Sequence, residues 1–143
     1  MIKIKNISAQ ETYNIRLTVL RNNIDLPFKF EGDKDESTFH LGAFYQGKLV
    51  GIATFVKKDL ESFEGKHYQL RGMATLPEVR GKGAGRLLIE KAKSILKEKR
   101  IAVLWCNARK EAIGFYEGLD FEIIGEEFEV IKVGPHYKMY AKI

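Results

Sequence analysis

The sequence predicts a single α+β domain built on one mixed, strongly twisted β-sheet flanked by helices. Residues 67–107 read as a strand, a glycine-rich turn, a long amphipathic helix and a second strand, which is the order of a βαβ crossover. Alternating segments joined by short turns lie on both sides of this unit, so the remaining strands are expected to pair antiparallel. The length of 143 residues suits one domain with its own core, spanning residues 1–143.

The elements are predicted in chain order from their patterns. Residues 1–7 alternate between apolar and polar like a strand, and the capping-box sequence at 8–11 begins a helix expected to reach Leu20. Residues 22–37 are polar and irregular, which predicts a loop beside a candidate binding site. The later patterns predict a hairpin of strands 39–45 and 49–57, a strand at 67–75, a helix from 84 to about 100, a strand at 101–107, a helix at 109–119, and strands at 121–132 and 136–142.

Composition is that of an ordinary globular protein, with 45% hydrophobic and 30% charged residues. No apolar run approaches the ~18–20 residues of a membrane span, and the N-terminus lacks the apolar block of a signal peptide. We therefore expect a cytoplasmic protein with no membrane partner. The single cysteine, Cys106, lies in an apolar strand and is expected to be a buried, unreactive thiol.

The strongest functional signal is the basic, glycine-rich turn at residues 80–86, Arg80-Gly81-Lys82-Gly83-Ala84-Gly85-Arg86. Its glycines lack the Cβ atoms that would keep a ligand away from the main-chain N–H groups. The helix that follows adds unpaired N–H groups and the positive end of its dipole. With three basic side chains beside it, this turn predicts a cradle for phosphate groups.

Two phosphate-binding families do not fit the spacing. A P-loop requires Ser or Thr after the Gly-Lys pair, but Lys82 is followed by Gly83. A dinucleotide fingerprint that starts at Gly81 requires glycine at its sixth position, which is Arg86, and an acid after the next strand, which ends in Asn107.

The remaining pattern, Arg80-x-x-Gly83-x-Gly85, resembles the acetyl-coenzyme A pyrophosphate loop of the GCN5-related N-acetyltransferases (GNAT family). A second segment agrees with this family: Asn107-Ala108 is followed by Ala112-x-x-Phe115-Tyr116 and by Gly118-Leu119-Asp120-Phe121, which looks like the family's Leu-Gly-Phe exit with Asp120 in place of glycine. The resemblance covers essentially the whole chain and is most specific over residues 70–121.

This resemblance implies an acetyl-CoA-dependent N-acetyltransferase that transfers the acetyl group to a primary amine by direct attack in a ternary complex, with acetyl-CoA as cosubstrate and no metal. The strands on either side of the central helix would splay apart around the coenzyme, and a main-chain N–H near Met73 or Ala74 would form the oxyanion hole. The residues implied for the coenzyme are Met73, Ala74, Thr75, Arg80, Gly81, Lys82, Gly83, Ala84, Gly85, Arg86 and Asn107.

The resemblance also implies catalytic roles. Tyr116 matches the tyrosine that approaches the coenzyme sulfur and would protonate the leaving thiolate, although helical spacing also fits a core aromatic. Asn107 would bind the coenzyme, cap the following helix, or do both. Some histone-modifying relatives use a glutamate as the general base at the position where this chain has Gln69, whose amide cannot take a proton. His136 is the predicted base or substrate ligand, with Glu126, Glu127 and His40 as alternatives.

Two other classes of function stay open. The missing base also fits an acyl-CoA-binding sensor without turnover. The net charge of +5 invites a nucleic-acid partner, but no nucleic-acid module accompanies it, and a bound coenzyme explains part of the basic cluster at 80–100. We expect acetyl-CoA and a small-molecule or peptide amine as partners, no nucleic acid, and a monomer or homodimer.

Overall fold

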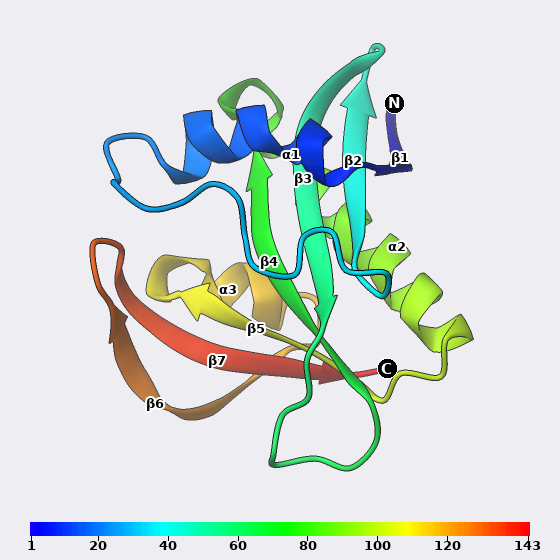
Figure 1. Ribbon diagram of the computed structural model, residues 1–143, viewed down its shortest axis with the longest axis vertical. Helices are drawn as coiled ribbons and strands as arrows, with labels where there is room; N and C mark the ends of the chain where they lie inside the picture. Colours follow the sequence, from blue (N-terminus) through cyan, green and yellow to red (C-terminus); the bar gives the residue numbers. More distant parts are fainter.

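The computed structural model describes all 143 residues, and its seven strands form one sheet in the order β1-β2-β3-β4-β5-β7-β6 (Figure 1). Only β4 and β5 run parallel, and every other neighbouring pair is antiparallel. The predicted mixed sheet of an α+β domain is confirmed. The strands are β1 Ile2–Ile7, β2 Phe39–Tyr45, β3 Lys48–Lys57, β4 His67–Thr75, β5 Val103–Arg109, β6 Glu122–Val130 and β7 Gly134–Lys142.

The first helix begins where the sequence predicts and changes character before it ends. The Glu11 N–H donates to Ser8 Oγ at 3.2 Å, and the Ser8 N–H donates to Glu11 Oε1 at 2.9 Å, which completes the capping box. The helix reaches Leu20 as predicted, but its last part is a π-helix. The helices are α1 Ala9–Ile15, the π-helix η1 Arg16–Leu20, the short 3₁₀ turns η2 Pro77–Val79 and η3 Lys110–Ala112, and α2 Ala84–Glu98 and α3 Ile113–Glu117. No helix is both long and apolar enough to cross a membrane.

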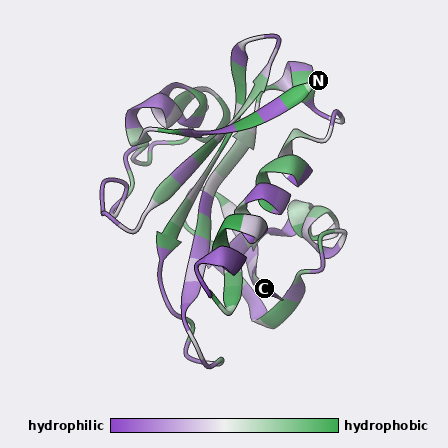
Figure 2. Cartoon of the chain, turned by 90° about the vertical axis from the view of Figure 1, so that its right-hand side faces the viewer, coloured by the Kyte–Doolittle hydropathy of each residue, from purple (hydrophilic) through white to green (hydrophobic).

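The core lies on both faces of the sheet because strand side chains alternate. Along β3, Ala53 and Phe55 belong to the main core cluster together with Leu88 of α2, whereas Ile52 packs with Ile15 of α1. The helices α1 and α2 therefore cover opposite faces. Figure 2 shows the same alternation of hydrophobic and hydrophilic residues along β1, next to the N-terminus.

The segment after β5 differs from the prediction. The predicted strand at 101–107 lies at 103–109, because its last residues still pair with β7, Asn107 with Lys138 and Arg109 with His136. The predicted helix at 109–119 is correspondingly shorter. Asn107 therefore does not cap a helix, and that interpretation is wrong: the N-cap of α3 is Ala112, which makes no side-chain cap bond.

The parallel strands β4 and β5 separate, as the family resemblance implies. Their pairing ends at Leu70 and Cys106, so the rest of β4 has no strand partner on this side. A β-bulge lies in the same stretch: Thr54 pairs with Arg71 and Ile52 with Ala74, which leaves two residues of β4 opposite one residue of β3. The opening exposes β4 main-chain groups beside α2 and α3, where the candidate site lies.

Candidate active site

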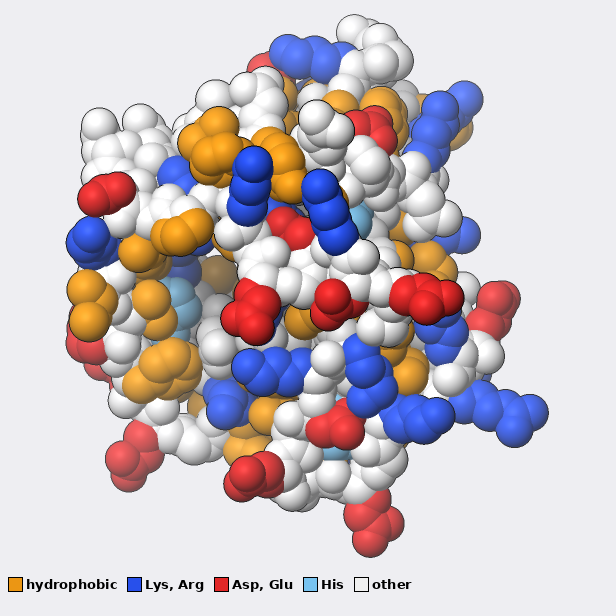
Figure 3. Space-filling model, viewed as in Figure 1, with side chains coloured by type: hydrophobic (Ala, Val, Ile, Leu, Met, Phe, Trp, Pro, Cys, Tyr) orange, Lys and Arg blue, Asp and Glu red, His pale blue; other side chains and the backbone are white.

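Two adjoining clefts open where β4 and β5 separate. One, about 650 Å³, is lined by the glycine-rich turn, the end of β4 and α3, and is called the glycine cleft below. The other, about 670 Å³, is lined by the loop after η1, the middle of β4, β5 and the β6–β7 turn, and is called the loop cleft. Leu20, Met73, Arg109 and Phe115 line both, so the two clefts meet at these residues. In Figure 3 the surface is hollowed between the loop after η1 and the β6–β7 hairpin, beside apolar, basic and histidine side chains.

The glycine-rich turn leaves a run of main-chain donors unpaired. The first helical bond of α2 runs from the Leu87 N–H to the Gly83 carbonyl. The N–H groups of Gly81, Gly83 and the next three residues, through Arg86, have no acceptor within the chain. Gly81 and Gly83 hold φ values of +81° and +84°, which other residues adopt only under strain. This geometry is that of an anion cradle at a helix N-terminus.

The basic side chains of the turn do not all face the cleft. Arg80 and Arg86 line the glycine cleft, together with Ala84 and Gly85. Lys82 does not line it: its ammonium lies 5.4 Å from the centre of the Tyr45 ring, and its N–H donates to the Val79 carbonyl.

The end of β4 forms the opposite wall of the glycine cleft. Met73, Ala74 and Thr75 all line it, and Met73 also lines the loop cleft.

Gly85 of α2 packs closely against Phe115 of α3: a Cβ at Gly85 would lie 3.0 Å from the ring. The absence of this Cβ lets the helix approach the aromatic ring that stands between the clefts.

Tyr116 lies at the inner wall of the loop cleft and is almost fully buried. Its ring packs edge-on against Phe115 and Phe121, with centroids 5.1 and 5.3 Å apart. Burial, followed by interaction with the Cys106 thiol, raises the pKa of Tyr116 well above its ordinary value. Burial also raises the pKa of Cys106 to about 12, which fits the unreactive thiol that the sequence predicts. At neutral pH both groups are protonated, and the phenol is a proton donor.

His136 lines the same cleft from β7, and its tautomer follows from one hydrogen bond. Its Nδ1 lies 2.8 Å from the Gly134 carbonyl oxygen, which can only accept. Nδ1 therefore carries the proton in the neutral ring, and Nε2 keeps a free lone pair. No group of the chain bonds to Nε2.

The alternative bases lie elsewhere or are occupied. Both ring nitrogens of His40 are bonded, Nδ1 to Thr54 Oγ1 at 2.7 Å and Nε2 to the Asp33 carbonyl at 2.8 Å. Glu127 pairs with Lys110 at 3.1 Å on the surface, and neither it nor Glu126 lines a cleft.

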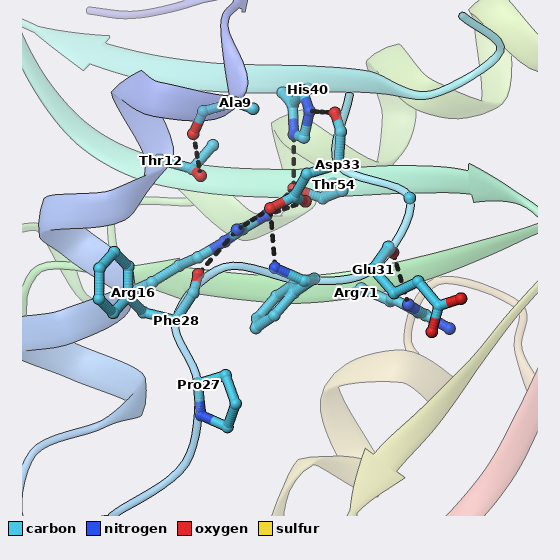
Figure 4. Close-up of polar contacts among 12 residues, drawn as sticks. Ala9, Thr12, Arg16, Pro27, Phe28, Glu31, Asp33, His40, Thr54 and Arg71 are labelled. Carbon is cyan, nitrogen blue, oxygen red and sulfur yellow. Dashed lines mark hydrogen bonds and ion pairs between the residues drawn. The ribbon is translucent and has the colours of Figure 1, made fainter. Parts of the chain in front are cut away.

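A buried arginine fixes the loop that covers the loop cleft. Arg16 is fully buried and donates two hydrogen bonds to Asp33, at 2.7 and 2.9 Å, and others to the Phe28 carbonyl and Thr54 Oγ1 (Figure 4). Its guanidinium carbon lies 3.8 Å from the centre of the Phe30 ring. The predicted binding loop at 22–37 therefore lies beside the cleft as expected, held by a network that the sequence analysis missed.

The sequence analysis also missed the basic residues of the loop cleft, Arg21, Arg71 and Arg109. Gln69, which the sequence marks as a vacant base position, is buried and accepts a hydrogen bond from Arg71 Nε at 2.9 Å. The only signal for Arg71 in the sequence is its place two residues after Gln69, on the same side of a strand.

Comparison with known proteins agrees with this geometry. The family model described as Acetyltransferase (GNAT) family matches residues 4–121. The uncharacterized N-acetyltransferase YitI of Bacillus subtilis is 39% identical over 145 residues, covering 100% of this chain and 97% of that protein. The chain belongs to the GNAT acetyltransferase family, which confirms the resemblance.

Solved structures share the fold at lower identity. Escherichia coli ElaA superposes with a TM-score of 0.81 at 17% identity, covering 99% of both chains. The ribosomal-protein-S18-alanine N-acetyltransferase of Escherichia coli gives a TM-score of 0.76 at 21% identity, covering 100% of this chain and 94% of that one.

Proposed function

We propose that the protein is an acetyl-CoA-dependent N-acetyltransferase that transfers an acetyl group to a primary amine by direct attack in a ternary complex. The observation that carries the proposal is the meeting of two clefts at Met73 and Phe115. One cleft presents an anion cradle, and the other presents a proton donor and an imidazole lone pair. Two substrates bound from opposite sides would meet where the clefts join.

The glycine cleft fits the phosphate groups of a coenzyme A. The main-chain N–H groups of Gly81 and of residues 83–86 have no acceptor in the chain, and nothing lies within 4 Å of a Cβ built at Gly81 or Gly83, so the space above them is free. Arg80 and Arg86 add positive charge beside these donors. When bound, acetyl-CoA supplies an acetyl thioester. Asn107 lines the loop cleft and not the glycine cleft, which favours contact with the reactive end of the coenzyme over its phosphates.

The acceptor amine must lose a proton before it attacks. A lysine-like amine with a pKa of ~10.4 is about 0.1% neutral at physiological pH, a deficit of roughly 4 kcal/mol. The free Nε2 of His136 lies in the wall of the loop cleft and is the group that accepts this proton.

The remaining steps use β4 and α3. A main-chain N–H at Met73 or Ala74, on the part of β4 that no longer pairs with β5, stabilises the oxyanion. The Tyr116 hydroxyl then donates its proton to the departing thiolate. A thiol of pKa ~8.5 leaves with limited help, so we expect this donation to contribute near the low end of the usual ~10²–10⁴-fold range.

The test has a binding part and a turnover part. Acetyl-CoA should raise the thermal midpoint of the protein, and pantetheine fragments without the nucleotide should raise it less, because the cradle binds phosphates. Release of free thiol from acetyl-CoA in the presence of an amine library then measures transfer. Equal shifts from pantetheine fragments would contradict the assignment of the glycine cleft. Binding without thiol release for any amine would instead indicate an acyl-CoA sensor.

A further inference from the structure

The loop cleft carries an excess of positive charge that no part of the chain neutralises. Its lining contains four basic side chains, Arg21, Lys29, Arg71 and Arg109, and a single acidic one, Glu31. None of the four takes part in an ion pair, although six ion pairs form elsewhere in the molecule. The cleft is therefore complementary to an anion.

Two of these arginines lie close enough to repel each other. The pKa of Arg21 is lowered by burial, then by the charge of Arg109, then by that of Arg16. The charge of Arg16 is balanced by Asp33, but Arg21 and Arg109 have no such partner. Like charges held together in a cleft cost stability that a bound anion offsets.

Arg71 is held in place without being neutralised. Its Nε donates to Gln69 Oε1 at 2.9 Å. Its Nη1 donates to the Glu31 carbonyl at 3.2 Å, as Figure 4 shows. Both acceptors are uncharged, and no bond occupies Nη2. Because these two hydrogen bonds already restrict the guanidinium, it loses little further conformational freedom when it binds a carboxylate.

The coenzyme does not account for this charge. Arg21, Lys29 and Arg71 line only the loop cleft, whereas the glycine-rich turn lines only the other one. The loop cleft is also mainly apolar: 12 of its 22 lining residues are hydrophobic, among them Leu26 and Val133. Its occupant therefore combines an anionic group with an apolar body.

We propose that the acceptor is a small amine that itself carries a carboxylate, an amino acid with an apolar side chain, whose carboxylate is bound by Arg71 together with Arg21 and Arg109. This rests on the proposed function of the site. Polyamines and other purely cationic amines are disfavoured, because they bring positive charge into a cleft that already has it in excess.

Matched pairs of acceptors test the proposal. Phenylalanine is compared with phenethylamine and leucine with isopentylamine, so that each pair differs in the carboxylate alone, and thiol release from acetyl-CoA is measured. Phosphoethanolamine against ethanolamine tests for phosphate, and spermidine tests for a polycation. We expect kcat/KM at least tenfold higher for each amino acid than for its decarboxylated partner. Equal or better use of the decarboxylated amines, the phosphate or spermidine would overturn the proposal while leaving acetyl transfer intact.

Variants and a binding measurement separate this proposal from the proposed function. Arg71→Gln should raise KM for the amino acid at least tenfold and leave KM for acetyl-CoA nearly unchanged, because Arg71 lines only the loop cleft. Arg109→Gln should also raise KM for the amino acid at least tenfold. Arg109 makes no side-chain hydrogen bond or ion pair in the chain, so its variant loses charge without breaking such a contact. Arg100→Gln removes one exposed charge outside both clefts and is the control.

The binding measurement needs no turnover. N-acetylphenylalanine should raise the thermal midpoint of the wild-type protein saturated with coenzyme A, and Arg71→Gln should lose that shift. No shift in the wild type, or an equal shift in the variant, refutes the carboxylate site even if acetyl transfer to other amines is found.

Discussion

Replacing Tyr116 by Phe removes one buried hydroxyl and keeps the aromatic ring in its place between Phe115 and Phe121. The ring contacts, at centroid distances of 5.1 and 5.3 Å, are unchanged, and the hydroxyl's neighbour Cys106 is a weak partner. The free energy of unfolding should therefore change by less than about 1 kcal/mol. Truncation to Ala removes the ring as well and should cost about 3–5 kcal/mol.

Turnover should fall much more than stability. Loss of the proton donor should lower kcat by roughly ten- to a hundredfold, which is about 1.4–2.7 kcal/mol of transition-state stabilisation, with little change in KM for acetyl-CoA. Because burial raises the pKa of Tyr116 well above its ordinary value, the phenol stays protonated over the usual assay range. The ratio of wild-type to variant kcat should therefore be constant from pH 6 to about pH 9.5.

A matched phenol supplies the control. The Tyr68 hydroxyl donates to the Ser37 carbonyl at 2.8 Å and lines neither cleft. Tyr68→Phe should lose about 0.5–1.5 kcal/mol of stability with unchanged turnover. Wild-type turnover from folded Tyr116→Phe, measured with an accepted amine, would assign Tyr116 to the core alone and leave the thiolate to be protonated by solvent.

Two further changes test the cradle and the loop. Gly83→Ala adds a Cβ at φ +84° and should abolish the rise in thermal midpoint caused by acetyl-CoA. The control is Gly47→Ala, at φ +79° in the β2–β3 turn, which has a similar backbone strain of about 1–2 kcal/mol and should keep that rise. Equal loss of the rise in both variants would contradict the cradle. Asp33→Asn breaks the buried pair with Arg16 and should cost about 3–5 kcal/mol in urea unfolding. Burial raises the pKa of Asp33, but the hydrogen bond from Arg16 and other contacts outweigh burial and lower it. The stabilisation by Asp33 is therefore present above the ordinary pKa of about 3.9 and is lost as pH falls through the lower pKa of the folded state. If the free energy of unfolding of Asp33→Asn fell at acid pH as it does in the wild type, this assignment would be contradicted.

The parts of the fold that the sequence predicts well are those that local patterns encode. The capping box at Ser8, the alternating strands and the glycine-rich turn each act over a few residues, and the structure has them where they were expected. The boundary after β5 was wrong because Asn107 has a side chain suited to a cap, while its main chain is held by the ladder to β7. Tertiary pairing decided that position.

The parts that the sequence does not predict depend on distant partners. Arg16 reaches Asp33 and Thr54, 17 and 38 residues away, and nothing near Arg16 in the sequence indicates a buried charge. The basic side chains of the loop cleft come from the loop, β4 and β5, and only the fold brings them together. The net charge of +5 shows that the chain has more basic than acidic residues, but it does not show where in the fold the unpaired basic residues lie.

The position of Gln69 connects the missing base with the proposed carboxylate site. A glutamate there would lie against Arg71, and the adjacent guanidinium would lower its pKa and make it a weak base. Gln69 instead orients Arg71 and leaves its charge available. The excess positive charge of the cleft also disfavours a bound ammonium, which lowers the pKa of the amine and reduces the work left for His136.

Gln69→Glu separates these roles. If the position lacks only a base, the substitution should raise kcat. If Gln69 positions Arg71, the new carboxylate should neutralise that arginine and raise KM for an amino acid acceptor at least tenfold, while KM for acetyl-CoA and the thermal midpoint change little. Gln69→Leu, which removes the acceptor without adding charge, should raise KM less. A higher kcat at unchanged acceptor KM in the glutamate variant would refute the positioning role and restore the carboxylate base as the feature that this chain lacks.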